Sequence, residues 1–451
     1  MMPAARTVPG PIGEDEALSL IDRVARRSTA GEIEIHLSGV DGSLSRYAGN
    51  QTVQNVSKAT LALRVTSCRD RRRASASTTE LDPDAVAATV RRAEEMAEIA
   101  PEDPEFVPPL APQDYPDHAP LFDDATARCT PAERGELVRQ VVSRSASAGV
   151  EASGTLATGT RMWAVGNSLG LRAYDRVTTA DFSCTTRTAD GGSAWVNRTA
   201  GALGALPIIE MTDGAIERGH ASSRPREISP GRYPVILDAA ATAELVRWLM
   251  WSMDARAADE GRSFMSRMGA DGRPDGNRLG EELFSPLVTL AREPAHPLLG
   301  LGRFFDNGLP AHRLAFVRAG VALTLHYDRY WAGRQGVAPT GPPLPLVMAG
   351  GEEALQDLVA ATERAILVTR AWYVRHVNPR TLEVTGLTRD GTFWIEDGRI
   401  SHPLKNLRFN QNLPELFQNV DAVGEVQRFG NCVAPVARAR GFDFVSVTDS
   451  V

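Results

Sequence analysis

The chain has 451 residues, of which 43% are apolar, and this length exceeds what one domain usually uses. Its formal net charge of −7 comes from 56 acidic and 49 basic residues spread along the sequence. No broad basic field is available for a phosphate backbone, so nucleic acid is not an expected partner. We interpret the densest basic run, residues 69–73, as a solvated turn.

The cysteines and the hydropathy pattern indicate the compartment. Cys68, Cys129, Cys184 and Cys432 lie far apart, without a CxxC pair or zinc-knuckle spacing. The first ten residues contain no apolar run typical of a signal peptide, and no later stretch approaches the roughly 20 apolar residues that span a bilayer. We therefore expect a cytoplasmic protein with no membrane partner.

The first segment, residues 1–120, has the pattern of a small α+β domain. Apolar residues at helical spacing predict helices over 14–28 and 82–99, and alternating residues predict strands over 32–37 and 61–65. Residues 101–120 contain seven prolines and are predicted to be a linker.

Two further segments follow. Residues 121–230 are predicted to hold a helix over 131–148 and antiparallel strands over 151–199. Residues 231–451 are predicted to form a β-rich domain that begins with a buried strand over 233–238 and a helix over 240–258. Turn sequences on both sides of residues 392–395 predict a hairpin there. The predicted fold class is α+β.

The order of these elements and several short motifs resembles the TldD/PmbA family. The motifs are Glu32-Ile33-Glu34-Ile35, Arg46-Tyr47-Ala48-Gly49-Asn50, Leu81-Asp82-Pro83-Asp84, Gly231-Arg232-Tyr233-Pro234-Val235-Ile236-Leu237, Glu260-Gly261-Arg262-Ser263-Phe264, Phe305-Asp306-Asn307-Gly308-Leu309-Pro310 and Ile395-Glu396-Asp397-Gly398-Arg399-Ile400. The resemblance implies an N-terminal α+β domain, a β-rich C-terminal domain, and two subunits that enclose a chamber. In the paired system TldD resembles a zinc peptidase with an HExxxH helix, and TldE is its metal-free partner.

The helix that would carry the zinc ligands lacks them. A zinc peptidase needs two histidines on one helix face, a further ligand and a glutamate that activates water. Residues 248–260 contain no histidine, and Trp251, Met253 or Arg256 stands where a ligand would be, depending on register. We therefore predict no catalytic residue and no cofactor in this chain, with zinc in an HExxxH-bearing partner.

Candidate site residues fall into two groups. Arg256, Asp259, Glu260 and Arg262 lie where the resemblance places the chamber opening, and Asp306 and His326 complete the substrate-chamber candidates. Folding could also bring Asp306 and His326 together with His312 and Asp328 as a substitute metal site, although these residues equally suit ordinary turns and strands. Trp248 and Trp251 are the candidates for a subunit interface.

Two isolated motifs have alternative interpretations. Ser168 lies in a GxSxG pattern, but the residues that follow alternate like a strand, which favours a hairpin turn over a nucleophile elbow. Cys432 lies close to the position of a TldD-type cysteine ligand, and we interpret it as a buried or edge thiol.

The leading hypothesis is a TldE-like, non-catalytic subunit of a zinc metallopeptidase assembly. Paired with a TldD-like subunit, it would shape a chamber in which the partner hydrolyses amide bonds in peptides or peptide-like small molecules. The alternatives are a stand-alone divergent hydrolase that acts as a homodimer, and a binding or scaffold protein.

Overall fold

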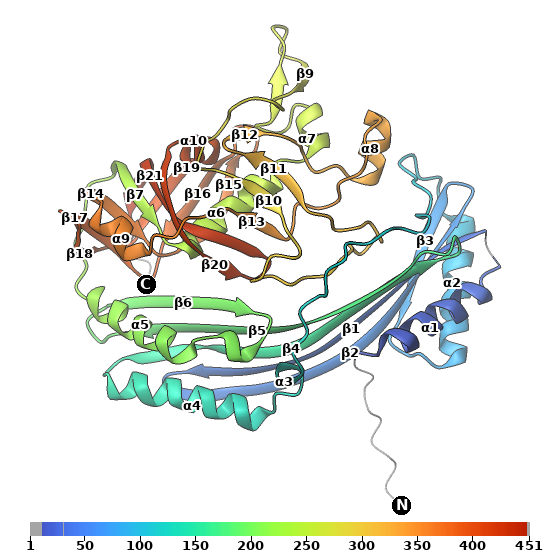
Figure 1. The fold of residues 1–451 in the computed structure, drawn as a ribbon, viewed down its shortest axis with the longest axis horizontal. Helices are drawn as coiled ribbons and strands as arrows, with labels where there is room; N and C mark the ends of the chain where they lie inside the picture. Colours follow the sequence, from blue (N-terminus) through green and yellow to red (C-terminus); the bar gives the residue numbers. More distant parts are fainter. Residues whose placement is uncertain (1–10, 30, 449–451) are drawn as a thin grey trace, which may run out of the picture.

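The structure is a computed structural model that describes residues 11–29 and 31–448. A long curved sheet from the N-terminal half lies under a β-rich domain from the C-terminal half (Figure 1). No helix in the described ranges is both long and apolar enough to cross a bilayer.

The first layer is a six-stranded antiparallel sheet with the strand order β3-β2-β1-β4-β5-β6. Its strands are β1 (Glu32–Ala48), β2 (Gln51–Arg69), β3 (Arg72–Thr78), β4 (Glu151–Asn167), β5 (Arg172–Arg187) and β6 (Ser193–Ala200). Strand β1 pairs directly with β4. The expected N-terminal domain, residues 1–120, and the middle segment, residues 121–230, therefore share one continuous sheet.

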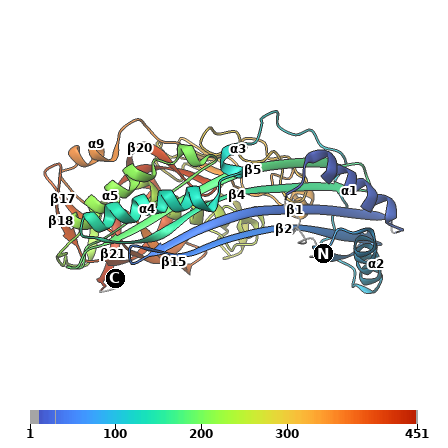
Figure 2. The same ribbon diagram turned by 90° about the horizontal axis from the view of Figure 1, so that it is seen from below.

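Helices cover one face of this sheet, with α1 and α2 at one end and α4 and α5 at the other (Figure 2). The helices of this half are α1 (Glu14–Arg27), α2 (Pro83–Ile99), α3 (Asp124–Ala127), α4 (Pro131–Ser147), a 3₁₀ turn (Leu203–Ala205) and α5 (Ile208–Ala221). Local sequence sets two of the starts. Asp82 caps α2 before a proline, and Thr130 and Glu133 form a capping box on α4.

Alternation along the strands gives the sheet two different faces. On β1, Ile33, Ile35 and Leu37 pack under the helices, so Glu34 and His36 face the C-terminal domain. On β4, Met162 and Ala164 lie in the helix-covered core. Their neighbours Arg161 and Trp163 therefore point to the C-terminal domain, as the residues of a functional face would.

The C-terminal domain contains a 13-stranded mixed sheet. Its strands are β7 (Gly231–Leu237), β10 (Leu290–Arg292), β11 (Leu314–Arg318), β12 (Val321–Ala322), β13 (Leu346–Met348), β14 (Arg364–Val368), β15 (Ala371–Asn378), β16 (Glu383–Thr388), β17 (Thr392–Glu396), β18 (Arg399–Leu404), β19 (Leu407–Asn412), β20 (Val420–Phe429) and β21 (Cys432–Val447). Strands β8 (Ser266–Met268) and β9 (Pro274–Asn277) form a separate hairpin. The helices are α6 (Ala239–Trp251), α7 (Ala255–Asp259), α8 (Arg329–Gln335), α9 (Leu355–Ala360) and α10 (Leu413–Gln418).

The hairpin predicted around residues 392–395 is present, and β17 and β18 form it. Asp397 and Gly398 both have positive φ, as a tight two-residue turn requires. On its other edge β17 pairs with β14 and not with β16, the strand that precedes it in sequence.

Among the features that differ from the sequence prediction, two concern helices next to the domain boundary. The helix expected over 240–258 is two helices, because the chain breaks at Ser252–Asp254 and pairs there with His326. Asp254 then caps α7 by accepting from the backbone N–H of Ala257. Helix α5 was not predicted.

A buried carboxylate joins the two layers. Asp175 on β5 accepts hydrogen bonds from the backbone N–H and the Nε of Arg303, at 2.6 and 2.8 Å. The Asp175 side chain is 1% exposed, and burial raises the pKa of this carboxyl although Arg303 opposes the rise. Beside it, a Cβ on Gly302 would come within 2.0 Å of the Trp163 ring, so only glycine fits this contact.

We expect Asp175→Ala to lower the free energy of unfolding by about 2–3 kcal/mol, because the substitution leaves the Nε and the backbone N–H of Arg303 without their acceptor. Urea denaturation measures the loss. Asp22→Ala is the matched control, since Asp22 pairs with Arg172 near the surface and should contribute less than about 1 kcal/mol. Equal losses in the two variants would contradict a special role for Asp175.

Candidate functional site

The C-terminal end of α6 projects large side chains outward. Leu245, Val246, Leu249 and Met250 fix the helix in the core. Trp251 is 69% exposed. A hollow of about 340 Å³ at this end is lined by Glu244, Arg247, Trp248 and Trp251.

The residues around this hollow do not fit a zinc ion. Its one acidic side chain, Glu244, pairs with Arg247 at 3.8 Å, and the Arg247 guanidinium also donates to the carbonyl of Phe429. A guanidinium and two indoles offer no lone pair of the kind that zinc accepts. Across residues 11–29 and 31–448, no three His, Cys, Asp or Glu side chains lie close enough together to hold a metal ion.

His326 lies at the junction of α6 and α7. Its Nδ1 is 3.5 Å from the Asp254 carboxylate, and its Nε2 is 3.4 Å from the backbone oxygen of Trp251. Burial lowers the pKa of the His326 imidazole, and Asp254 partly opposes this shift. The ring lies between these two partners and so supports the bend between the two helices.

The four residues considered as a substitute metal site do not come together as a set. Asp328 caps α8 by accepting from the backbone N–H of Trp331, and the backbone oxygen of His312 accepts from Arg292. Asp306 lies on a cavity between the layers, while His326 pairs with Asp254. The arrangement matches the ordinary structural roles that these residue types also suit.

The charged candidates on α7 form a surface network. Arg256 donates to Glu105 of the proline-rich linker at 2.8 and 3.1 Å and to Glu260 at 3.0 Å. The bonds to Glu105 are the largest cause of the raised pKa of Arg256. Arg262 also bonds Glu260, and Arg256 and Arg262 together lower the pKa of the Glu260 carboxyl. This network ties α7 to the linker.

Asp259 has structural partners of its own. It accepts from the indole N–H of Trp331 at 2.8 Å and from the Asn277 amide at 3.1 Å. Of the six substrate-chamber candidates, Asp306 lies on the cavities described next, whereas the other five cluster around α7 and its contact with His326.

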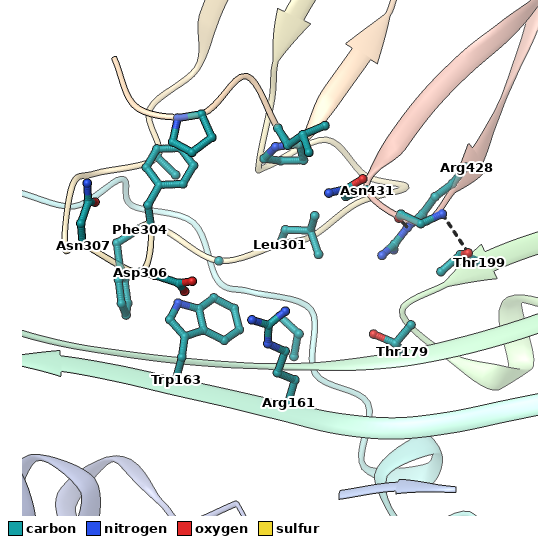
Figure 3. Close-up of a pocket in the computed structure, with 18 residues that line it drawn as sticks. Arg161, Trp163, Thr179, Thr199, Leu301, Phe304, Asp306, Asn307, Arg428 and Asn431 are labelled. Atoms are coloured by element: carbon teal, nitrogen blue, oxygen red, sulfur yellow. Dashed lines mark hydrogen bonds between the residues drawn. The ribbon is translucent and has the colours of Figure 1, made fainter. Parts of the chain in front are cut away.

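The largest of the cavities described here, about 620 Å³, lies between the curved sheet and the C-terminal domain (Figure 3). The sheet provides Arg161, Trp163, Val177, Thr179 and Thr199. The facing wall comes from the C-terminal domain. It consists of Leu301, Gly302, residues 304–307, Ala311, Pro342, Leu344, Pro345, and Arg428, Gly430 and Asn431 at the β20–β21 turn. Of these, our sequence predictions included only Asp306. From the sequence, the spacing of Arg161 and Trp163 shows that the two side chains share one face of a strand, but it does not show which segments cover that face.

A second cavity of about 470 Å³ contains ionisable groups from both layers. Glu34 and His36 on β1 face Asp306 and Arg329 there. Burial raises the pKa of Glu34 and lowers that of His36, while Arg329 opposes the first shift and Asp306 the second. Asp306 thus borders both cavities.

Ser168 occupies the turn between β4 and β5, as the alternating pattern predicted. Its Oγ accepts from the backbone N–H of Ile33 at 3.2 Å, and a strand follows it. The elbow geometry of a serine hydrolase is therefore absent at this position. Cys432 is fully buried in β21, and burial raises the pKa of its thiol to about 11, which suits an inert core thiol.

The fold is that of a two-layer α+β protein, with a helix-covered antiparallel sheet under a β-rich domain (Figure 1). Residues 230–446 match the PmbA/TldA metallopeptidase C-terminal domain. The predicted resemblance to the TldD/PmbA family and the predicted α+β fold class are confirmed.

Known relatives extend the similarity over nearly the whole chain. Metalloprotease PmbA from Escherichia coli O157:H7 is 22% identical over 429 residues, which cover 91% of each protein. The crystal structure of a protein described as a modulator of DNA gyrase from Bacteroides thetaiotaomicron has a TM-score of 0.84 at 20% identity, and covers 96% of this chain and 99% of that one. TldE from Thermococcus kodakarensis has a TM-score of 0.83 at 17% identity, with the same coverage.

We expect Ser168→Ala to leave any hydrolytic activity of the protein or its assembly unchanged, and to cost about 1 kcal/mol of stability through the lost bond to Ile33. Activity assays at a temperature well below the unfolding midpoint separate the two effects. A drop in activity of about a hundredfold or more, as loss of a nucleophile would give, would restore the serine-hydrolase interpretation.

Proposed function

We propose that this chain is a TldE-like, non-catalytic subunit of a zinc metallopeptidase assembly that hydrolyses amide bonds in peptides or peptide-like small molecules. The zinc would belong to a TldD-like partner with an HExxxH helix, and this chain would complete the chamber. The main support is that α6 lies within the matched domain, residues 230–446, and that the hollow at its exposed end is lined by Glu244, Arg247, Trp248 and Trp251, which do not form a zinc ligand set.

The same end of α6 supports a subunit interface. Trp248 packs edge-on against His376 at 4.6 Å between ring centroids, which holds its ring in place beside the exposed Trp251. Large aromatic side chains are frequent anchors of protein interfaces. We propose that the partner covers this hollow, and that the network of Arg256, Glu260 and Arg262 lies near the chamber opening.

A cytoplasmic location is part of the proposal. Cys68, Cys129, Cys184 and Cys432 are all free thiols in the structure, as in proteins of a reducing compartment. Neither nucleic acid nor a membrane is among the proposed partners.

We expect the chain purified alone to contain no stoichiometric zinc and to hydrolyse no peptide, because the end of α6 lacks zinc-binding side chains. Mixing it with an HExxxH partner should produce chelator-sensitive hydrolysis. Elemental analysis and a mixed peptide library, applied to each chain and to the pair, measure both properties. Robust hydrolysis by this chain alone would favour the stand-alone hydrolase, and no hydrolysis by any pairing would favour a binding or scaffold role.

We expect Trp251→Glu to weaken association with the partner by about 2 kcal/mol or more, because a charge would replace an exposed aromatic anchor. Analytical ultracentrifugation of the mixed chains measures the change. The control is Ile99→Glu at the end of α2, since Ile99 is also an exposed apolar residue, at 85% exposure, but lies on the other layer. Equal association of the two variants would place the interface elsewhere.

A further inference from the structure

The cavity between the layers is lined by several polar side chains that form no hydrogen bond within the described residues. Arg161 and Trp163 rise from the same face of β4, and Thr179 rises from β5 beside them (Figure 3). In the described ranges, the Arg161 guanidinium has no hydrogen bond or ion pair, and its recorded contact is with the Trp163 ring at 5.7 Å. The Thr179 hydroxyl and the Asn431 amide likewise have no recorded hydrogen bond there.

The other arginines at this boundary are already engaged. Arg303 binds Asp175, while Arg428 donates to the backbone oxygens of Gly430, Leu298 and Leu299 at 2.8, 2.8 and 3.1 Å. Burial lowers the pKa of Arg428 to about 10, so it stays charged at neutral pH and adds positive potential to the cavity. Among the arginines that line this cavity, Arg161 is therefore the one whose guanidinium N–H groups are free to bind a ligand.

The rest of the cavity is apolar or carries the opposite charge. Trp163, Phe304, Phe305, Leu301 and Leu344 provide aromatic and aliphatic surface. Asp306 lies on the same cavity and can accept from an N–H group. A volume of about 620 Å³ is within the range of small-ligand sites and suits a peptide segment of a few residues.

We propose that this cavity binds a carboxylate of a short peptide, with Arg161 and Thr179 holding the carboxylate and the aromatic wall holding the adjoining apolar side chain. Asp306 would accept from a peptide N–H or ammonium group. The free donors of the Arg161 guanidinium match a singly charged carboxylate. This inference rests on the proposed function, since it assigns a substrate class to the non-catalytic subunit.

The test is isothermal titration calorimetry of the full chain without a partner, so that neither zinc nor hydrolysis enters the measurement. The probes are the tripeptide alanyl-alanyl-phenylalanine, its C-terminal amide, and the amide with glutamate in the middle position. The variants are Arg161→Ala and Arg161→Lys. Arg187→Ala is the control, because Arg187 is an exposed arginine at the end of the same sheet and does not line the cavity. Thermal unfolding confirms that each variant is folded.

We expect the free tripeptide to bind about tenfold or more tightly than its amide, the size of a charge-assisted hydrogen bond. Arg161→Ala should remove this preference, Arg161→Lys should keep part of it, and Arg187→Ala should leave it intact. If the glutamate amide recovers the affinity, the site accepts a side-chain carboxylate as well as the C-terminal one. If it does not, the C-terminal carboxylate is the ligand.

Equal binding of the free acid and the amide, an unchanged preference in Arg161→Ala, or no binding at millimolar peptide would overturn the assignment of this cavity. None of these results would affect the proposal that the chain pairs with a zinc-bearing subunit, which is measured by hydrolysis in the mixed assembly. Conversely, a failure to find partner-dependent hydrolysis would leave the measured carboxylate preference standing. The two proposals therefore fail separately.

Discussion

The bond between Asp175 and Arg303 is the constraint on which the arrangement of the two layers depends. The carboxylate lies under the C-terminal domain, where burial disfavours its charge, and the Arg303 side chain and backbone N–H compensate for this cost. Because Arg303 is held there, the chain passes close over Trp163 at Gly302 and then turns outward with Phe304 and Asp306. The cavity is the space left beside this anchored segment.

Much of the N-terminal layer could be predicted from local sequence, since its signals act over a few residues. Asp82 before a proline starts α2, and the alternation of Glu34 and His36 with buried isoleucines identifies a half-buried strand. Local sequence does not show that β1 pairs with β4 across the proline-rich linker, so that the expected N-terminal domain and the middle segment share one sheet. The break between α6 and α7 has the same origin, because the pairing partner of Asp254 is the distant His326.

The candidate site was predictable only in part for a related reason. Arg256, Glu260 and Arg262 are close in sequence and form the expected cluster, but their partner Glu105 comes from the linker. The cavity takes its residues from strands and turns far apart in the chain. A strand pattern places Arg161 and Trp163 on one face, but only the folded protein shows that the β20–β21 turn and the segment with Asp306 lie over that face.

In helix α6 the residues that hold the helix in the core are separate from the side chains at its exposed end. The helix is held by residues on its inner face, such as Leu245 and Leu249, which are fully buried and independent of what stands at the exposed end. The side chains at that end are therefore free to change without loss of the core. Because Trp251 is 69% exposed, its ring contributes little to the stability of the fold. Burying that ring against another surface would therefore add hydrophobic free energy to an association. The exposed Trp251 beside the half-buried Trp248 is therefore the observation on which the proposed subunit interface rests.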